Sequence, residues 1–383
     1  MLPPVSAAEH DLFAVSAPGL ERVVAGELKT LGFSNVRELP GGAAFRGSLA
    51  DALRANLWLR TASRVLLRLA AFDAPGRREL LARLKRLDLS AFVGPREPIA
   101  VSATSHQSRL YHTGLVTEAI LEAFARLPAA RGAAAPQLFV RLVRDRCTLS
   151  IDTSGELLHR RGYRLGAARA PLRETLAAGL LLLCDYDGSR PLADPMCGSG
   201  TIPIEAALIA TGRAPNAARA MAVDRFPGAE PAALAKVRAE ALASACPAGA
   251  VILGADVNGG ALATARANAE RAQVASVIRF ERANVADLRP PAPAGLLLTN
   301  PPYGRRLSRL ARGTDAWAAL RSALTGAFAS WRRAVLGPGV ELRERLKLSV
   351  VRAVRLENGG LPVELLEYRP PTAEPEAAPA ADR

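Results

Sequence analysis

An asparagine, two prolines and a tyrosine follow directly after an apolar run. Residues 296–299 read Leu-Leu-Leu-Thr, the composition of a buried strand, and Asn300-Pro301-Pro302-Tyr303-Gly304 comes next. Because proline cannot donate to a ladder of strand hydrogen bonds, the strand must end there and the chain leaves the sheet in a stiff loop. The Asn300 side-chain oxygen and the Pro301 carbonyl then form a rigid pair of acceptors beside the Tyr303 ring. Such a pair suits a planar amine whose heterocycle stacks on the tyrosine.

A glycine-rich turn lies upstream, after another short strand. Asp194 ends the strand, and Pro195-Met196-Cys197-Gly198-Ser199-Gly200 leads to a helix. Glycine permits positive φ and close approach of the backbone to a ligand, and we expect Thr201 to be the helix N-cap, with Pro203 in the first turn. The loop has an acid where a ligand ammonium could lie, and it lacks the Gly-Lys-Ser/Thr of a Walker A loop. It therefore favours S-adenosylmethionine over a nucleotide phosphate.

Two further strand ends carry polar residues. Asp256 closes the strand at 251–255, the position that commonly binds ribose hydroxyls. It lies farther beyond Gly200 than the usual spacing of about 20 residues, so we expect residues 212–248 to hold an insertion with its own helix. A third strand leads into 281–287, where an adenine edge could be read. The predicted cofactor contacts are Asp194, Met196, Cys197, Gly198, Ser199, Gly200, Thr201, Asp256, Val257, Asn284, Val285 and Asp287.

Repeated strand–helix units position these strand ends. The pattern predicts a mostly parallel sheet, because strands alternate with helices. Two segments around Asn358-Gly359-Gly360 predict an antiparallel C-terminal hairpin. The expected strands are 191–194, 251–255, 276–280, 294–299, 334–336, 350–356 and 363–368, and the expected helices are 172–184, 202–210, 231–244, 259–271 and 315–331.

The front part of the chain alternates short strands and helices without a catalytic pattern, since His10, His106 and His112 have no partner groups near them in sequence. It resembles a binding module of small mixed α/β units. We expect strands at 12–16, 43–46, 64–71, 99–104, 138–143 and 147–151, and helices at 20–31, 51–59, 77–87 and 113–126.

The charge balance favours a polyanionic partner. The 383 residues carry a net charge of +14, with an excess of positive charge in both halves; a genome-wide preference for arginine would also produce it. Residues 158–164 place arginines around an aromatic ring, which suits phosphate and base contacts, while a solvated linker is the alternative interpretation. The predicted RNA contacts are Arg160, Arg161, Tyr163, Arg164, Arg305 and Arg306.

Several classes of protein are disfavoured. No apolar run approaches the roughly 20 residues of a membrane span, and the first residues lack the basic start and apolar stretch of a signal peptide. The four cysteines form no Cys-x-x-Cys pair and the four histidines form no cluster. These features predict a reduced, cytoplasmic protein without a metal site.

Taken together, the two loops resemble those of the THUMP-domain class I RNA methyltransferases. The chain is most similar to the bacterial enzymes that methylate guanine N2 in 23S ribosomal RNA, from about Leu12 to Tyr368, including residues 54–64, 158–164 and 170–177. Asn284 stands where the family usually has an acid, so either Asn284 or Asp287 would contact the adenine amine. Some relatives carry a second methyltransferase domain behind the first, and this sequence ends before one.

The resemblance implies an α/β fold, with a Rossmann-like class I methyltransferase domain that follows a ferredoxin-like/THUMP α+β module. The implied boundaries are 1–65 for a ferredoxin-like region, 66–155 for THUMP, 156–170 for a linker, 171–370 for the methyltransferase domain and 371–383 for a disordered tail.

The implied activity is S-adenosylmethionine-dependent methylation of a guanine N2 amine in RNA, with 23S ribosomal RNA as the substrate. Asn300 and the Pro301 carbonyl would aim the lone pair of the amine at the sulfonium methyl, and Tyr303 would stack on the flipped base. Neither a metal nor a covalent intermediate is implied. The alternatives are a tRNA guanine-N2 methyltransferase, a protein glutamine-N5 methyltransferase and a non-catalytic RNA-binding factor. The oligomeric state stays open.

Overall fold

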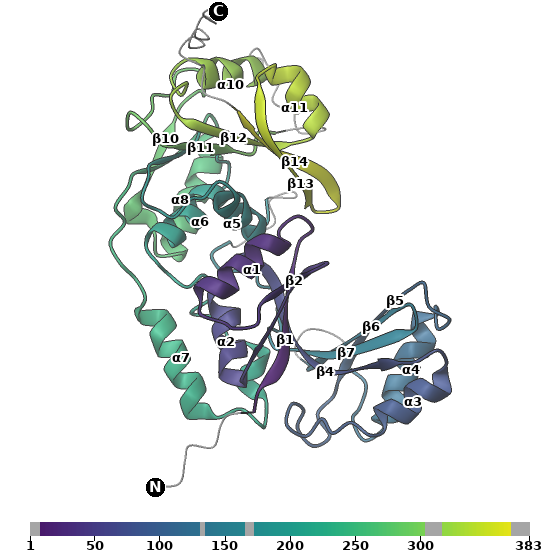
Figure 1. The fold of residues 1–383 in the computed structure, drawn as a ribbon. Helices are drawn as coiled ribbons and strands as arrows, with labels where there is room; N and C mark the ends of the chain where they lie inside the picture. The colour runs from purple at the N-terminus through teal and green to yellow at the C-terminus, as the bar shows by residue number, and fades with distance from the viewer. Residues whose placement is uncertain (1–7, 131–134, 165–171, 303–315, 369–383) are drawn as a thin grey trace, which may run out of the picture. The chain divides into compact units, whose positions relative to one another are not determined.

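The structure is a computed structural model that describes residues 8–130, 135–164, 172–302 and 316–368. The chain divides into two compact units (Figure 1). The first unit comprises 1–161 and 213–245, and the second comprises 162–212 and 246–383. A segment from the middle of the chain therefore returns to the first unit. None of the helices in the described ranges is long and apolar enough to cross a membrane.

The first unit is built on one seven-stranded sheet of order β2-β3-β1-β4-β7-β6-β5, in which only β5 and β6 are parallel neighbours. Strand β4 is 12 residues long and pairs with β1 on one side and β7 on the other, so it joins the two halves of the sheet. The strands are β1 (His10–Ser16), β2 (Arg37–Leu39), β3 (Gly42–Gly47), β4 (Ala62–Asp73), β5 (Ala100–His106), β6 (Gln137–Val143) and β7 (Arg146–Asp152).

Helices bury leucine and alanine side chains against one face of this sheet. Alternation along β1 turns Leu12 and Ala14 toward that core, which leaves Asp11 and Phe13 on the opposite face. Ser48 begins α2 with a capping box to Asp51, which fixes the start of the helix. The helices of the unit are α1 (Glu21–Thr30), α2 (Leu49–Trp58), α3 (Arg77–Leu84), α4 (Thr113–Ala123) and α7 (Pro231–Ala243).

The segment 213–245 confirms the predicted insertion and its helix. Helix α7 lies beside α2 (Figure 1), and its Leu234 and Ala241 belong to the core of the first unit. Nδ2 of Asn216 donates to the Asn56 carbonyl at 3.0 Å, inside a buried polar network. Thr211 and Cys246, which flank the insertion, are joined by a backbone hydrogen bond of 2.9 Å. The insertion therefore leaves and re-enters the second unit at one place.

The second unit contains a seven-stranded sheet of order β10-β9-β8-β11-β12-β14-β13. Its first five strands are parallel and β14 runs antiparallel to both neighbours, as the sequence predicts. The strands are β8 (Leu192–Asp194), β9 (Ile252–Asp256), β10 (Ile278–Arg282), β11 (Leu296–Thr299), β12 (Arg332–Gly337), β13 (Val350–Asn358) and β14 (Leu361–Tyr368), and the helices are α5 (Glu174–Leu183), α6 (Thr201–Ala210), α8 (Gly259–Arg271), α10 (Ala316–Thr325) and α11 (Gly339–Leu346).

Three elements differ from the sequence prediction. The helix predicted to reach residue 331 ends at Thr325, because Phe328 and Trp331 turn back into the core. Helix α11 was not predicted, since it is short, charged and anchored only by its buried Leu342 and Leu346. Strand β2 was also missed, because its three residues are largely exposed and show no apolar alternation. The predicted tail at 371–383 lies outside the described residues.

Candidate active site

The predicted site residues follow strands that are neighbours in the sheet. Strand order reverses at β8, where β9 and β10 lie on one side and β11 and β12 on the other. In an open parallel sheet, ligands bind at the carboxyl ends of the strands at such a switch point. Asp194 ends β8, Asp256 ends β9 and Asn300 follows β11. The structure thus brings the three predicted positions to one edge of one sheet.

Asp194 is a buried carboxylate held from two sides. The residue is 2% exposed, and its Oδ1 accepts hydrogen bonds from Thr299 Oγ1 at 2.7 Å and from the Met196 N–H at 3.2 Å. Burial raises the pKa of Asp194 from 3.8 to about 7; the two hydrogen bonds oppose this shift, and the nearby Asp256 charge adds to it. No ion pair to Asp194 occurs within the described ranges. A bound cation would therefore stabilise the ionised carboxylate.

The glycine turn after Asp194 has the backbone that its sequence predicts, with φ of +54° at Gly198 and +82° at Gly200. A Cβ on Gly200 would lie 2.9 Å from the Ala265 Cβ, so this position also requires a close helix approach. The predicted N-cap was wrong: Gly200 caps α6, and Thr201 is the first helical residue. The turn needs positive φ at the residue before the helix, and a β-branched residue adopts that conformation poorly.

Asp256 fixes the same turn from the next strand. Its Oδ2 accepts from the Gly198 N–H at 2.9 Å, and its Oδ1 accepts from the Asn258 N–H at 2.9 Å. Asn258 in turn caps α8 with its side-chain oxygen. Val257, between them, is 51% exposed, an apolar side chain held at the strand end. Carboxylate oxygens with a second lone pair and an apolar neighbour suit ribose hydroxyls and a flat ring.

Two residues on α8 support the turn through hydrogen bonds, and neither was predicted from the sequence. Asn268 is fully buried and donates through Nδ2 to the Ser199 carbonyl at 3.0 Å. Arg271 donates to Asn268 Oδ1 at 2.5 Å and to the Tyr163 carbonyl at 2.6 Å. The available signal was an asparagine on the buried face of the helix, beside Leu262 and Ala265. Such a polar residue requires a partner.

Three of the predicted RNA-binding residues have structural roles instead. Arg161 is buried and donates to the Leu158 and Arg60 carbonyls. Tyr163 is buried, and its hydroxyl donates to Glu205 at 3.1 Å. Arg164 donates to Thr201 Oγ1 at 2.5 Å and pairs with Glu174 at 3.5 Å. Their burial and internal hydrogen bonds leave these side chains little surface for RNA.

Arg160 is the exposed member of the segment. Its side chain is 63% exposed and pairs with Glu156 at 2.9 Å, so an RNA contact there stays a prediction. Tyr303, Arg305 and Arg306 lie outside the described residues.

The loop after β10 has a hydrogen-bonded turn at the expected position. Asn284 Oδ1 accepts from the Ala286 N–H at 3.1 Å, and the Asn284 carbonyl accepts from the Asp287 N–H at 3.0 Å. Val285 is buried in the core of the unit, whereas Asp287 is exposed. Asn284 therefore shapes the turn, and the exposed Asp287 carboxylate is the freer acceptor for an amine.

The side chain of Asn300 provides a buried hydrogen-bond acceptor. Its Oδ1 is buried and has no hydrogen-bond partner in the part of the chain that the structure describes. A buried amide oxygen left without a partner costs about 1–3 kcal/mol. Thr299, immediately before it, donates a hydrogen bond to Asp194, so Asn300 follows directly after a residue that contacts the acid at the end of β8. An N–H donor arriving at this place, such as an amine, would remove that cost.

Comparison with known proteins gives matches over most of the chain. The family model described as "UPF0020: RMKL-like, methyltransferase domain" matches residues 161–367. A second, described as "RlmL ferredoxin-like domain", matches residues 11–66.

Relatives match over more than nine-tenths of this chain. A putative RNA methyltransferase, slr0064 of Synechocystis, is 31% identical, with 95% of this chain and 97% of that protein covered. A ribosomal RNA large subunit methyltransferase K/L of Syntrophotalea carbinolica is 35% identical, with 93% of this chain but 53% of that protein covered. The chain thus spans about half the length of that relative. The solved structure of SMU.472, a putative methyltransferase complexed with SAH, has a TM-score of 0.83 and 28% identity, and covers 96% of this chain and 100% of that chain.

Proposed function

This chain belongs to the RMKL-like methyltransferase family, and on that basis we propose that it transfers a methyl group from S-adenosylmethionine to the N2 amine of a guanine in RNA. The observation that carries the proposal is the buried, unpartnered Oδ1 of Asn300 at the end of β11. It supplies an acceptor for an amine beside the strand ends of Asp194 and Asp256.

The residues present fit the proposed cofactor. Buried Asp194, whose pKa is raised to about 7, suits a cationic group, and Asp256 with exposed Val257 suits a ribose and its base. A Cβ built on Gly198 would meet nothing within 4 Å, so the turn leaves open space beside its backbone. When bound, S-adenosylmethionine supplies a methyl group on a positively charged sulfur.

The protein's own part of the reaction is orientation. The amine of guanine is a weak nucleophile, because its lone pair is delocalised into the ring. Asn300 Oδ1 accepts a hydrogen bond from the amine, and the Pro301 carbonyl is the second proposed acceptor. Pro301 and Pro302 restrict the loop that carries them. Holding the nucleophile in a reactive direction removes entropy from the activation barrier, which is the main source of acceleration in this mechanism.

The substrate class is inferred from the relatives and from charge. Two relatives are described as RNA or ribosomal RNA methyltransferases. The excess of Lys and Arg over Asp and Glu supports a nucleic acid over a protein substrate. We propose 23S ribosomal RNA, which would be met in the cytoplasm, and retain tRNA as the alternative RNA.

Mass-spectrometric mapping of N2-methylguanosine tests the proposal. Ribosomal RNA and tRNA are compared from cells with and without the gene, and from deletion cells that express the wild type or Asn300→Ala. We expect one 23S ribosomal RNA modification to disappear on deletion and to return only with the wild type. If deletion removes N2-methylguanosine from tRNA alone, the substrate is tRNA and not 23S ribosomal RNA. Full restoration of the modification by Asn300→Ala would refute the role of the acceptor.

A further inference from the structure

The sheet of the first unit carries arginines on the face opposite its helices. Register places Asp11 opposite Arg46 on one side and Arg68 on the other, so these three form one row across β3, β1 and β4. Arg37 on β2 pairs with Ala44, which shares that face. Arg141 on β6 lies two strands beyond β4, on the same face. We refer to Arg37, Arg68 and Arg141 as the arginine face; Arg46 lies in the same row but pairs with carboxylates.

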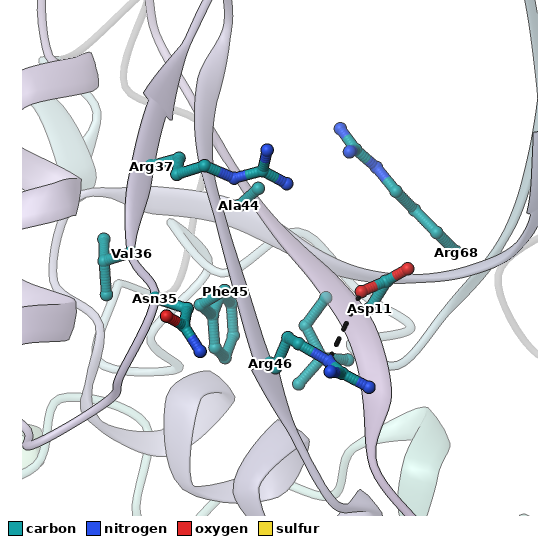
Figure 2. Close-up of a pocket in the computed structure, with 9 residues that line it drawn as sticks. Asp11, Asn35, Val36, Arg37, Ala44, Phe45, Arg46 and Arg68 are labelled. Atoms are coloured by element: carbon teal, nitrogen blue, oxygen red, sulfur yellow. Dashed lines mark ion pairs between the residues drawn. The ribbon is translucent and has the colours of Figure 1, made fainter.

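Part of this face lines an open pocket of about 370 Å³ (Figure 2), referred to below as the cavity. Its lining includes Asp11, Asn35, Arg37, Arg46 and Arg68. Figure 2 draws the side chains of Arg37, Arg46 and Arg68 around Asp11, with the ion pair between Arg46 and Asp11 dashed. The cavity therefore presents several N–H donors and a single carboxylate.

Carboxylates neutralise only part of the positive charge on this side of the sheet. Arg46 pairs with Glu9 at 3.5 Å and with Asp11 at 3.6 Å. Within the described ranges, Arg37, Arg68 and Arg141 have no ion pair. Burial lowers the pKa of Arg68, and the charges of Arg37 and Arg141 lower it further. The charge of Asp11 raises this pKa but does not cancel the decrease. These like charges repel one another, and a bound anion would offset that repulsion.

The aromatic rings on this face are already covered by arginines. The guanidinium of Arg68 lies 4.4 Å from the centre of the Phe13 ring. That of Arg64, which is also paired with Asp152, lies 5.3 Å from the centre of Phe139. A ring under a guanidinium offers no free face to a nucleic-acid base. Stacking on Phe13 instead holds the Arg68 guanidinium in one orientation, and its N–H groups are available to donate to an anion.

We infer that the arginine face binds the sugar–phosphate backbone of the RNA substrate, without reading its sequence. The inference rests on the proposed function and adds to it the surface and the chemical group that are recognised. From β2 to β6 the face covers five strand spacings, roughly 24 Å along the sheet, which is room for several phosphates. Arginine suits this role because its planar fork matches phosphate oxygens.

Binding of a 23S ribosomal RNA transcript to the full chain, measured over a range of KCl concentrations, tests the inference. The binding constant K falls as salt rises, so the slope of log K against log salt is negative. Each lost phosphate contact lowers the magnitude of this slope by about 1. We expect a fall of about 2 in Arg37→Gln/Arg141→Gln, because these exposed side chains make no hydrogen bond or ion pair in the described structure. The fall should be about 3 when Arg68→Gln is added. At saturating RNA the single-turnover methylation rate should equal that of the wild type.

Two single-site controls each remove one positive charge. Arg46→Gln removes an arginine of the same cavity that is already paired, and Lys29→Gln removes an exposed cation of α1, on the helix side of the sheet. We expect both to keep a slope close to that of the wild type. A triple variant with the wild-type slope, or single-site controls whose slopes each fall in magnitude by about 1, would overturn the inference. If instead the slopes change as expected but the wild type methylates no RNA, the proposed function fails and the arginine face stands.

Discussion

Replacing Asp194 by asparagine should stabilise the protein while it weakens cofactor binding. An asparagine can keep both hydrogen bonds that Oδ1 of Asp194 accepts, from Thr299 at 2.7 Å and from Met196 at 3.2 Å. What it removes is the cost of holding a charge in a site that is 2% exposed. The substitution therefore separates a functional charge from the packing around it.

The size of the effect depends on pH in a defined direction. Burial raises the pKa of Asp194 from 3.8 to about 7, so the folded state retains a proton that the unfolded state has lost. The stability due to this proton is complete below about pH 4 and is lost as pH rises through about 7. At 1.36 kcal/mol for each pKa unit, the advantage of asparagine over aspartate is about 2 kcal/mol at pH 5.5 and about 4 kcal/mol at pH 8.

Thermal unfolding of the wild type and Asp194→Asn at both pH values measures this difference. In a domain of 150–250 residues, 1 kcal/mol shifts Tm by about 2–4 °C. The variant should therefore melt several degrees higher than the wild type, with the larger gap at pH 8. Calorimetry at pH 8 should show cofactor affinity at least about tenfold weaker, since hydrogen bonds to charged groups contribute about 1.5–3 kcal/mol. A variant that is less stable than the wild type, or a gap that does not change with pH, would refute the reasoning.

Three further changes test the surroundings of the site. Asp256→Ala should weaken cofactor binding by about 1.5–3 kcal/mol in calorimetry, and unchanged affinity would exclude the assigned contact. Asn268→Ala leaves the Ser199 carbonyl without its 3.0 Å donor, so cofactor KM should rise while kcat stays close to that of the wild type; a loss in kcat alone would contradict this. A fragment of 162–383 with 213–245 replaced by a short Gly/Ser linker should fold and bind cofactor, because the flanking residues Thr211 and Cys246 are already hydrogen-bonded. The same fragment with the insertion retained should aggregate in light scattering, since α7 loses its core partners; equal behaviour of the two fragments would disprove this.

The sheet that carries the site could be predicted from sequence because its signals are local. Apolar runs that stop at Asp194, Asp256 and Asn300 identify the strands and the ends that matter, and the alternation of strands with helices gives a parallel sheet. Glycines 198 and 200 identify the turn. Short elements such as α11 bury too few residues to leave a periodic signal.

The contacts that fix the site were harder to predict, because they join residues far apart in sequence. Thr299 bonds to Asp194 across 105 positions, and Asn268 bonds to Ser199 across 69. Nor did the arginines of 158–164 reveal their partners, since exposed and buried arginines look alike in a sequence. Tertiary packing determines which of these arginines donate to buried carbonyls and carboxylates.

Single-turnover methyl transfer by Asn300→Ala tests the central claim most directly. One protein preparation is divided between thermal melting, calorimetry with S-adenosylmethionine and transfer to a 23S ribosomal RNA transcript. Because the lost acceptor acts on the amine in the transition state, we predict melting no lower than that of the wild type and wild-type cofactor affinity, with the methyl-transfer rate abolished. A folded Asn300→Ala protein that transfers methyl groups at the wild-type rate would contradict the account.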